Sequence, residues 1–373
     1  MRRASISRIS RISRISRISR ISGLSLLPLL ASCALNADVA APVAPTAGGA
    51  ARTRLCVEPP RGPVHEYRHR RSRLYKSLGE PRFRGIDLIA MEDDPVQILG
   101  GKLAYTSADK DVGDEDVHVF ACFPDGWRAV GRARTDREGR FELALAGAHR
   151  LPVGMRDLYT HVPGDGGGVR FLGYVAPRGA AAIVSDVDGT LTESEEAILN
   201  TVLFGDDVGY QPHAPAALAA AARGWPIIYV TARGDQYTEV TRRWLAVHGF
   251  PRGPLRLARS VIVPPGGRSV AFKTDVFRAL RIPIAAGIGN RASDITAYTN
   301  AGLPPERILI NLPEFAGEVA ADLAAGRATG FDDYREVPAL LARPVTAAAA
   351  ASAAPVAPAA HAAPAAAAAS AAP

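Results

Sequence analysis

The sequence predicts two domains, a small antiparallel β-sandwich followed by an α/β domain built on a doubly wound parallel sheet without a large cap. Three observations predict this fold class. Residues 86–178 contain short runs of partly alternating apolar residues, separated by Gly, Pro and Asp. From residue 180 onward, apolar strand segments alternate with helical segments. Polar residues follow these later strands where they end, as expected at the carboxyl edge of a parallel sheet.

Six short strands are expected in the first domain, residues 86–178. Turn-forming residues separate them at intervals of roughly 8 to 12 residues, a spacing typical of a small Ig-like sandwich. Residues 134–139 predict a hairpin turn. His118, His149 and His161 are scattered, and we expect ordinary surface or hydrogen-bonded side chains rather than ligands. The domain is therefore interpreted as a spacer or a packing partner. The predicted strands are 96–105, 116–123, 127–136, 139–146, 155–163 and 169–177.

Four strands and four helices alternate in the second domain, residues 180–342. The strands are continuously apolar, as in a parallel sheet that is buried on both faces. The second helix ends at Gly249, and it carries Val240, Trp244 and Val247 along one stripe. The predicted strands are 181–187, 225–232, 282–290 and 306–311, and the predicted helices are 214–224, 235–249, 274–281 and 292–302.

Two aspartates, Asp186 and Asp188, end the first strand of this domain. Residues i and i+2 lie on the same side of an extended chain, so both carboxylates point to one place. One can attack phosphorus to form an aspartyl phosphate, while the other delivers a proton to the leaving oxygen and later activates water. Because two neighbouring carboxylates repel each other, a cation is required. Mg²⁺ suits them, since it prefers oxygen ligands and bridges to phosphate.

Further polar residues follow the other strand ends. Thr231 ends the second strand, Lys273 precedes a helix, and Asn290 and Asp294 follow the strand at 282–290. Asn290 and Asp294, one helical turn apart, can complete a Mg²⁺ site. Lys273 can neutralise phosphoryl oxygens, and Thr231 can donate a hydrogen bond to one of them. Each element alone is a weak signal, but the four in this order predict a phosphoryl-transfer site.

Spacing and nearby arginines suggest the kind of substrate. Only 42 residues separate Asp188 from Thr231, and 41 separate Thr231 from Lys273, so neither gap holds a large lid. A lidless site needs a bulky substrate or a membrane surface to exclude water. Lipid headgroups fit, as do phosphoproteins or nucleic acid ends. The predicted substrate-binding residues are Gly189, Thr190, Arg233, Arg242 and Arg291, although Arg242 is equally well explained as a surface charge on a helix.

This ordered set of motifs resembles the haloacid dehalogenase superfamily of phosphohydrolases. The resemblance implies that Asp186 is the nucleophile and Asp188 the acid/base. It also implies that Thr231 and Lys273 stabilise the phosphate. The Mg²⁺ ligands would be Asp186, the backbone carbonyl of Asp188, Asn290 and Asp294.

Within that superfamily, residues 181–312 are similar to the catalytic LNS2-type domain of lipins, which are Mg²⁺-dependent phosphatidate phosphatases. The stretches SDVDGTLTESE, YVTARGDQYTEVTRRWL, GPLRL, FKTDVF and GIGNRASDITAYTNAGLPPERILIN carry the similarity. Arg256 departs from it, since the lipin pattern is usually apolar there. The segment is also similar to the lipin-like domain of certain phosphatidylinositol-transfer proteins. These lack the second aspartate and are taken to bind lipid without hydrolysis, so the presence of Asp188 favours catalysis.

The resulting hypothesis is a Mg²⁺-dependent hydrolase of a lipid phosphomonoester, with phosphatidate converted to diacylglycerol. Two alternatives stay open, namely a phosphatase for a soluble or macromolecular phosphoester and a non-catalytic lipid-binding module. A nucleic acid partner is not expected. Seven arginines in the first 22 residues account for the net charge of +7, and the remaining 37 Lys and Arg balance the 37 Asp and Glu. No obligate protein partner is evident.

The N-terminal segment predicts export. Residues 1–32 combine a basic stretch with a short apolar run, the layout of a secretory signal that is too short to span a bilayer. Residues 30–33 resemble a bacterial lipobox, in which Cys33 is lipidated. An ordinary cleaved signal and a mitochondrial presequence are the alternatives. We therefore expect a bacterial envelope protein, anchored through Cys33 or else periplasmic or secreted.

The remaining segments are predicted to lie outside the domains. Residues 33–85 form an Ala/Pro-rich and then basic linker, and its basic part, 65–84, either lies on anionic lipid or is simply solvated. Cys56 and Cys122 could pair in an oxidising compartment, although the sequence does not show that they meet. Residues 343–373 form an Ala/Pro-rich tail that we predict to be disordered.

Overall fold

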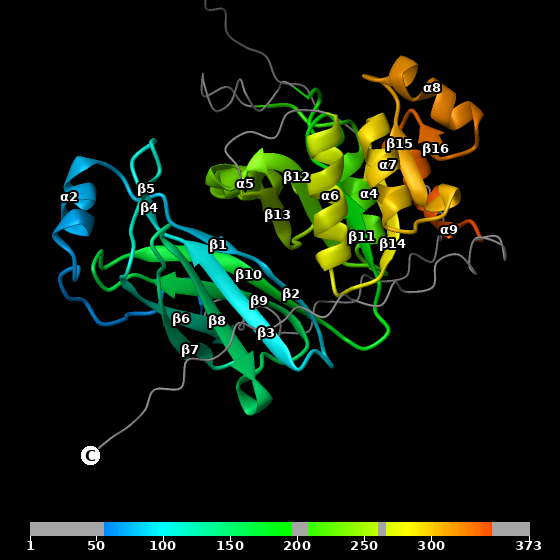
Figure 1. Cartoon of the computed structure of the whole chain (residues 1–373). Coiled ribbons are helices and arrows are strands. Elements are labelled where there is room, and N and C mark those ends of the chain that lie inside the picture. Colours follow the sequence, from blue (N-terminus) through cyan, green and yellow to red (C-terminus); the bar gives the residue numbers. More distant parts are fainter. Residues whose placement is uncertain (1–55, 196–207, 260–265, 345–373) are drawn as a thin grey trace, which may run out of the picture. The chain divides into compact units, whose positions relative to one another are not determined.

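The computed structural model describes residues 56–195, 208–259 and 266–344 (Figure 1). The predicted signal sequence, Cys33 and all but the first two residues of the C-terminal tail lie outside these ranges. In the described ranges, no helix is long and apolar enough to cross a membrane.

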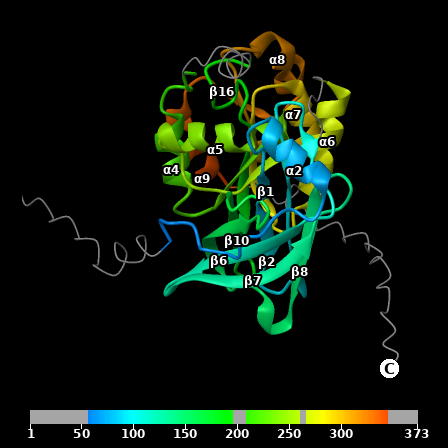
Figure 2. The same cartoon turned by 90° about the vertical axis from the view of Figure 1, so that its left-hand side faces the viewer.

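The first domain is a sandwich of two sheets (Figures 1 and 2). Alternate residues of each strand point inward, as in β6, where Val117, Val119 and Ala121 are fully buried. All six predicted strands are present. The five-stranded sheet has the order β2 (Leu88–Met91), β10 (Gly168–Ala176), β9 (Gly154–His161), β6 (Asp116–Phe123) and β7 (Gly126–Arg134). The three-stranded sheet has the order β1 (Arg84–Ile86), β3 (Val96–Lys102) and β8 (Arg140–Ala146), and β4 (Ala104–Tyr105) pairs with β5 (Lys110–Asp111).

Strands β1, β2 and β5 were not predicted, and two further features of the sandwich differ from the prediction. The turn after β7 is present, but β7 and β8 lie in different sheets, so the turn is a crossover between sheets and not a hairpin. Its side chains explain the sharp reversal, because Asp136 accepts hydrogen bonds from the backbone N–H groups of Glu138 and Arg140. The pair β2–β10 is parallel, whereas the other sandwich ladders are antiparallel.

Part of the predicted linker belongs to the sandwich. Residues 70–78 form helix α2 (Arg70–Leu78), and Tyr67 and Phe83 are buried in the sandwich core. The Tyr67 hydroxyl hydrogen-bonds that of Tyr105 over 2.9 Å. Leu74 and Leu78, one helical turn apart, are 54% and 61% exposed. The basic stretch is therefore a folded element, and its outer face carries two leucines among arginines.

A disulfide joins Cys56 to Cys122 of β6 and attaches the start of the described chain to the sandwich. The two cysteines are 66 positions apart in the sequence, so the disulfide closes a long loop. Replacing both cysteines by serine is expected to lower the free energy of unfolding by about 2–4 kcal/mol, because the unfolded chain regains the entropy of that loop. Urea unfolding of the full chain measures the loss, with Cys33→Ser as the control. Equal stability with and without reductant would contradict this role.

The second domain is built on a six-stranded parallel sheet, as predicted. The central strand β11 is fully buried, and successive residues face opposite sides, Ile183 toward one core and Val184 toward the other. The strand order is that of a doubly wound sheet with its switch point at β11. In sheet order the strands are β13 (Leu255–Ala258), β12 (Ile227–Gly234), β11 (Ala182–Ser185), β14 (Ile284–Gly289), β15 (Ile308–Asn311) and β16 (Thr329–Phe331).

Helices cover both faces of this sheet. Three of them contribute buried residues to the core that contains Ile183, and three to the core that contains Val184. The first group is α4 (Ala214–Ala221), α5 (Thr238–Val247) and α9 (Val337–Ala342), and the second is α6 (Gly267–Ala279), α7 (Ala292–Asn300) and α8 (Ala316–Ala324). The two edge strands β13 and β16 and the helices α8 and α9 were not predicted from the sequence. Helix α6 also begins seven residues before its predicted start.

Candidate active site

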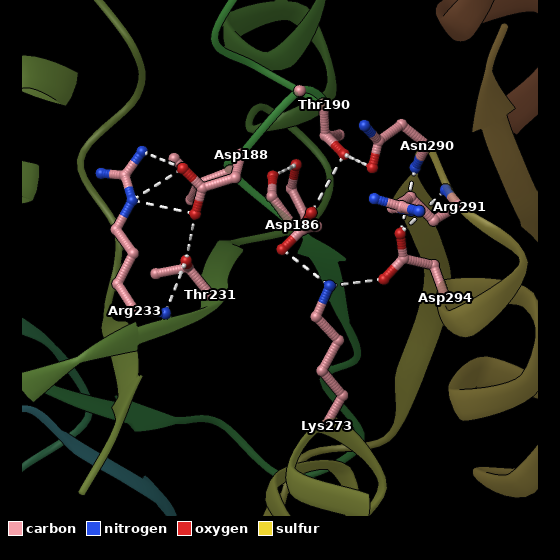
Figure 3. A network of polar contacts seen from close by, with 12 residues as sticks. Asp186, Asp188, Thr190, Thr231, Arg233, Lys273, Asn290, Arg291 and Asp294 are labelled. Carbon is pink, nitrogen blue, oxygen red and sulfur yellow. Dashed lines mark hydrogen bonds and ion pairs between the residues drawn. The ribbon is translucent and has the colours of Figure 1, made fainter. Parts of the chain in front are cut away.

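The predicted motif residues come together at the carboxyl edge of the sheet (Figure 3). Strand β11 ends at Ser185, so Asp186 and Asp188 lie in the loop that follows it and not in the strand itself. Thr231 comes from β12 and Lys273 from α6, while Asn290 directly follows β14. Because β11, β12 and β14 are adjacent and parallel, their ends meet at one place.

Lys273 links two buried carboxylates. Its ammonium lies 2.8 Å from Oδ1 of Asp186 and 2.5 Å from Oδ1 of Asp294. All three side chains are at least 94% buried. Asp294 also accepts hydrogen bonds from the backbone N–H groups of Asn290 and Arg291, both over 3.1 Å. The first turn of α7 therefore holds Asp294 beside the ammonium, and Lys273 compensates two charges that burial would otherwise make costly.

Burial raises the pKa of Asp186 to about 7. The neighbouring carboxylates of Asp294 and Asp188 raise it too, while the Lys273 ammonium acts in the opposite direction. Removal from water disfavours the charged form of any carboxyl group, and nearby negative charge adds to that effect. Asp186 thus has the environment of a reactive carboxylate that needs positive charge close by to stay ionised.

Thr190 and Asn290 form the other side of the Asp186 environment. The Thr190 hydroxyl lies 3.2 Å from Oδ2 of Asp186 and 3.1 Å from Oδ1 of Asn290. The amide nitrogen of Asn290 is buried and has no hydrogen-bond partner in the described residues. Gly189 adopts a positive φ of 66°, and a Cβ atom there would lie 2.2 Å from that amide nitrogen. Glycine at this position therefore lets the loop approach Asn290.

Asp188 is held by residues of β12 and the turn after it. Its Oδ2 accepts a hydrogen bond from the Thr231 hydroxyl over 2.7 Å. The Arg233 guanidinium donates to both carboxylate oxygens, over distances of 2.5 to 2.9 Å. Arg233 also donates to the Thr241 hydroxyl over 2.9 Å, which fixes its orientation. The sequence analysis expected Arg233 to bind a substrate phosphate; in this structure its partner is Asp188.

Arg291 lies at the rim of the cluster and is held by groups that the sequence analysis missed. Its guanidinium pairs with Glu195 and with Glu318, the latter over 2.8 Å. It also stacks on the Phe315 ring, with its carbon 4.1 Å from the ring centroid. Burial raises the pKa of Glu195, although Arg291 opposes this shift. No local sequence signal marks these partners, because the loop after β11 and helix α8 meet only in the folded chain.

Arg242 does not lie at this site, which corrects the expectation that it joins the predicted substrate-binding set. Its guanidinium pairs with Asp87 of the sandwich, with Nη2 and Oδ1 separated by 2.9 Å. Asp87 is fully buried and also accepts the backbone N–H groups of Leu172 and Leu255. Helix α5 presents this arginine to the sandwich, so Arg242 compensates a buried charge between the domains.

The residues around Asp186 match the ligand preference of Mg²⁺ in kind. Asp186 and Asp294 supply carboxylate oxygens, and Asn290 supplies an amide whose nitrogen and oxygen exchange places when the side chain flips. The buried amide nitrogen of Asn290, which has no hydrogen-bond partner in the described residues, is the observation that supports the fit. A flip of the side chain would put the amide oxygen, a possible metal ligand, in its place. In the described residues, no group of three or more His, Cys, Asp or Glu side chains is arranged to hold a metal ion. A cation would therefore depend on Asn290 and backbone oxygen as well as on carboxylates.

Comparison with protein families gives one match for each domain. Residues 82–175 match the model of the β-sandwich domain of PITM 1-3, and residues 183–311 match the model of the LNS2 domain of PITM 1-3. The two matches follow one another in the order of the two observed domains. The LNS2 match covers the candidate site from Asp186 to Asp294.

Individual relatives give the same picture. Membrane-associated phosphatidylinositol transfer protein 2 of Homo sapiens is 27% identical over 67% of this chain. Protein retinal degeneration B of Drosophila melanogaster is 27% identical over 59% of this chain. These matches cover only 18% and 17% of the relatives' own lengths, so the chain shares one part of much longer proteins.

A solved structure from Thermotoga maritima, named as a candidate β-phosphoglucomutase, is 14% identical over 43% of this chain and 98% of its own. Its TM-score is 0.32, too low to support a conclusion about fold or function.

Proposed function

We propose that this chain, whose two domains match the models of the β-sandwich and LNS2 domains of PITM 1-3, is a Mg²⁺-dependent phosphomonoesterase that acts on a lipid phosphate. The single observation that carries the proposal is Asp186, a buried carboxylate of raised pKa beside Lys273, with Asp188 two residues on. Phosphatidate is the proposed substrate, and diacylglycerol and inorganic phosphate are the products.

The positions of the side chains support the following reaction. A carboxylate oxygen of Asp186 attacks phosphorus, the bond from phosphorus to the lipid oxygen breaks, and an aspartyl phosphate forms. Asp188 protonates the leaving oxygen and then takes a proton from the water that releases phosphate. Lys273 and Thr231 lie beside these two carboxylates, where they can stabilise charge on the phosphoryl oxygens.

Mg²⁺ would be held by Asp186, the Asp188 carbonyl, Asn290 and Asp294, and it would supply positive charge that offsets the phosphoryl group and keeps Asp186 ionised. Arg233 holds Asp188 in the free protein. A substrate phosphate would compete for that guanidinium, since Arg donates equally well to phosphate and carboxylate. Arg233 would then bind the substrate phosphate in place of Asp188, and Asp188 would be free to transfer a proton to the leaving oxygen.

A membrane-side location in an oxidising compartment is part of this proposal. The Cys56–Cys122 disulfide supports the compartment, since disulfides persist in exported proteins. The exposed leucines of α2, flanked by arginines, support contact with an anionic lipid surface. Lipidation of Cys33 would keep the site close to lipid substrates.

A non-catalytic lipid-binding module is the second candidate function. It is favoured by the charge compensation at the site, where Lys273 pairs with two carboxylates and Arg233 occupies Asp188. The relatives are also named as lipid transfer proteins. Such a module would bind a phosphate-bearing lipid at this edge without hydrolysing it.

Phosphate release from phosphatidate in mixed micelles distinguishes the two functions. The full chain is assayed with Mg²⁺ and with a chelator in its place, and an aryl phosphate serves as a second substrate. Release from phosphatidate that requires Mg²⁺ is the expected result. Cleavage of the aryl phosphate alone would leave the chemistry and reject the lipid substrate. If neither substrate is cleaved, the enzyme proposal fails and the binding module becomes the better account.

A further inference from the structure

A polar hollow lies on the sandwich, and it contains none of the active-site residues. Its volume is about 320 Å³, and Pro63, His65, Asp116, His118 and Arg132 line it. The sequence analysis predicted ordinary roles for the sandwich histidines. The structure places two of them, His118 and His161, in one row with an arginine.

Strand register creates this row. His118 of β6 lies directly opposite Arg132 of β7 on one side and opposite His161 of β9 on the other. Directly opposite residues of antiparallel strands project from the same face of the sheet. The His118 and His161 rings accordingly meet edge to face, with centroids 6.4 Å apart. Three basic side chains therefore cross three adjacent strands on one face.

The segment before α2 forms the wall of the hollow and is firmly attached. The His161 ring lies 2.8 Å from the Pro63 carbonyl, which makes His161 a support for this wall. Gly62 packs so closely on the same ring that a Cβ atom there would lie 2.2 Å from it. Nearer the start of the segment, the Glu58 carbonyl accepts a hydrogen bond from the Trp127 indole over 2.7 Å. The Cys56–Cys122 disulfide anchors the first residue of the segment to the sandwich.

Positive groups are in excess around the hollow. No hydrogen bond or ion pair is found for the side chains of His118 and Arg132 among the described parts of the chain. His65 donates from Nδ1 to the backbone carbonyl of Glu66 over 2.9 Å. Asp116, the one carboxylate of the lining, is shared by Arg68 at 3.7 Å and Arg134 at 3.3 Å. Its charge is thus already compensated from outside, and Arg132 faces the hollow uncompensated.

The surroundings of His118 lower its pKa below the ordinary value of a histidine. Partial burial lowers it most, and the positive charges of Arg132, His161 and His65 lower it further, while Asp116 acts in the opposite direction. A bound anion would reverse much of this effect, because it favours the protonated ring. Protonation of His118 and anion binding should therefore promote each other.

We propose that this hollow binds a phosphate group, either as free phosphate or as part of an anionic lipid headgroup. Arg132 can donate two parallel hydrogen bonds to a pair of phosphate oxygens. His118 and His65, which also line the hollow, can donate to the other phosphate oxygens when their rings are protonated. A cluster of three such donors suits a tetrahedral anion with several acceptor oxygens. The site is distinct from the Asp186 cluster and does not depend on catalysis.

NMR titration of the full chain with inorganic phosphate tests the proposal. The imidazole signals of His118 report on this hollow alone, so phosphate bound at the Asp186 cluster does not interfere. We expect phosphate to shift these signals, to raise the pKa of His118, and to bind at least about tenfold more weakly at pH 8 than at pH 6. Arg132→Gln should weaken the binding by a similar factor.

Two further measurements keep the test decisive. Arg128→Gln is the matched control, because Arg128 lies on the same strand but pairs with Asp125 outside the lining; it should leave phosphate binding unchanged. Flotation with phosphatidylglycerol vesicles at pH 6 separates the two sources. Loss of flotation in Arg132→Gln would identify a lipid headgroup, and flotation equal to wild type would identify free phosphate. Absence of phosphate-induced shifts at His118, or equal binding by Arg132→Gln with an unchanged fold, overturns the proposal.

Discussion

Replacement of Asp186 by asparagine is expected to lower phosphate release by roughly 10³ to 10⁶-fold, because an amide cannot attack phosphorus to form the acyl phosphate. The substitution keeps the size of the side chain. Lys273 retains Asp294 as a partner at 2.5 Å, so the fold should persist. Phosphate release from phosphatidate measures the loss. Asp275→Asn is the matched control, because it makes the same chemical change at an exposed position of α6.

The same variant should also change the pH dependence of stability in the presence of a chelator. The folded-state pKa of Asp186 is raised to about 7, above its ordinary value of 3.8. A raised pKa contributes stability below the unfolded-state value, and this stability is lost as the pH rises through 7. Asp186→Asn removes the ionisation and should be the less pH-dependent protein between pH 4 and 8. Wild-type activity in Asp186→Asn would refute its role as nucleophile.

Replacement of Lys273 by methionine is expected to lower the free energy of unfolding by roughly 3–5 kcal/mol at pH 8. Methionine fills a similar volume but leaves the buried carboxylates of Asp186 and Asp294 without the ammonium that lies between them. The large effect therefore comes from two uncompensated charges and not from lost packing. Urea unfolding of the full chain in chelator measures it.

Two comparisons isolate the charge effect of Lys273. The Asp294→Asn substitution in the Lys273→Met background should restore part of the stability, since it removes one of the two uncompensated carboxylates. The loss should also shrink toward pH 5, because removal of the ammonium raises the pKa of Asp186 further and the carboxyl takes up a proton. Lys110→Met, at an exposed position, should change stability by about 0.5 kcal/mol or less. A Lys273→Met protein as stable as wild type at pH 8 would show that the carboxylates find other compensation.

The grouping of the candidate residues was predictable where motif and topology coincide. Thr231, Lys273 and Asn290 are far in the chain from Asp186 and Asp188, but each lies near the end of a strand or in a helix beside it. Parallel strands place such positions at one edge of the sheet, whatever the details of packing. The fold class was predictable for the same reason, because continuously apolar strands alternating with helices have few other ways to bury their surfaces.

The edge elements were harder to predict from sequence. Strands β13 and β16 contain four and three residues, which is too short for a clear hydrophobic period. Helix α2 was interpreted as linker because seven basic residues lie in that stretch, although Tyr67 and the Cys56–Cys122 disulfide attach it to the sandwich. Local composition does not show which buried partner a short segment will find.

By itself, the sequence determined the order of the two domains, the parallel sheet and the set of polar residues at its carboxyl edge. Tertiary structure alone decided the partners: Arg242 with Asp87, Arg233 with Asp188, and Arg132 beside His118. Hydrophobic period is a local property of the chain and can be recognised in a single segment. The partner of a charged side chain depends on strand register and domain contact, which bring together residues that are far apart in the sequence.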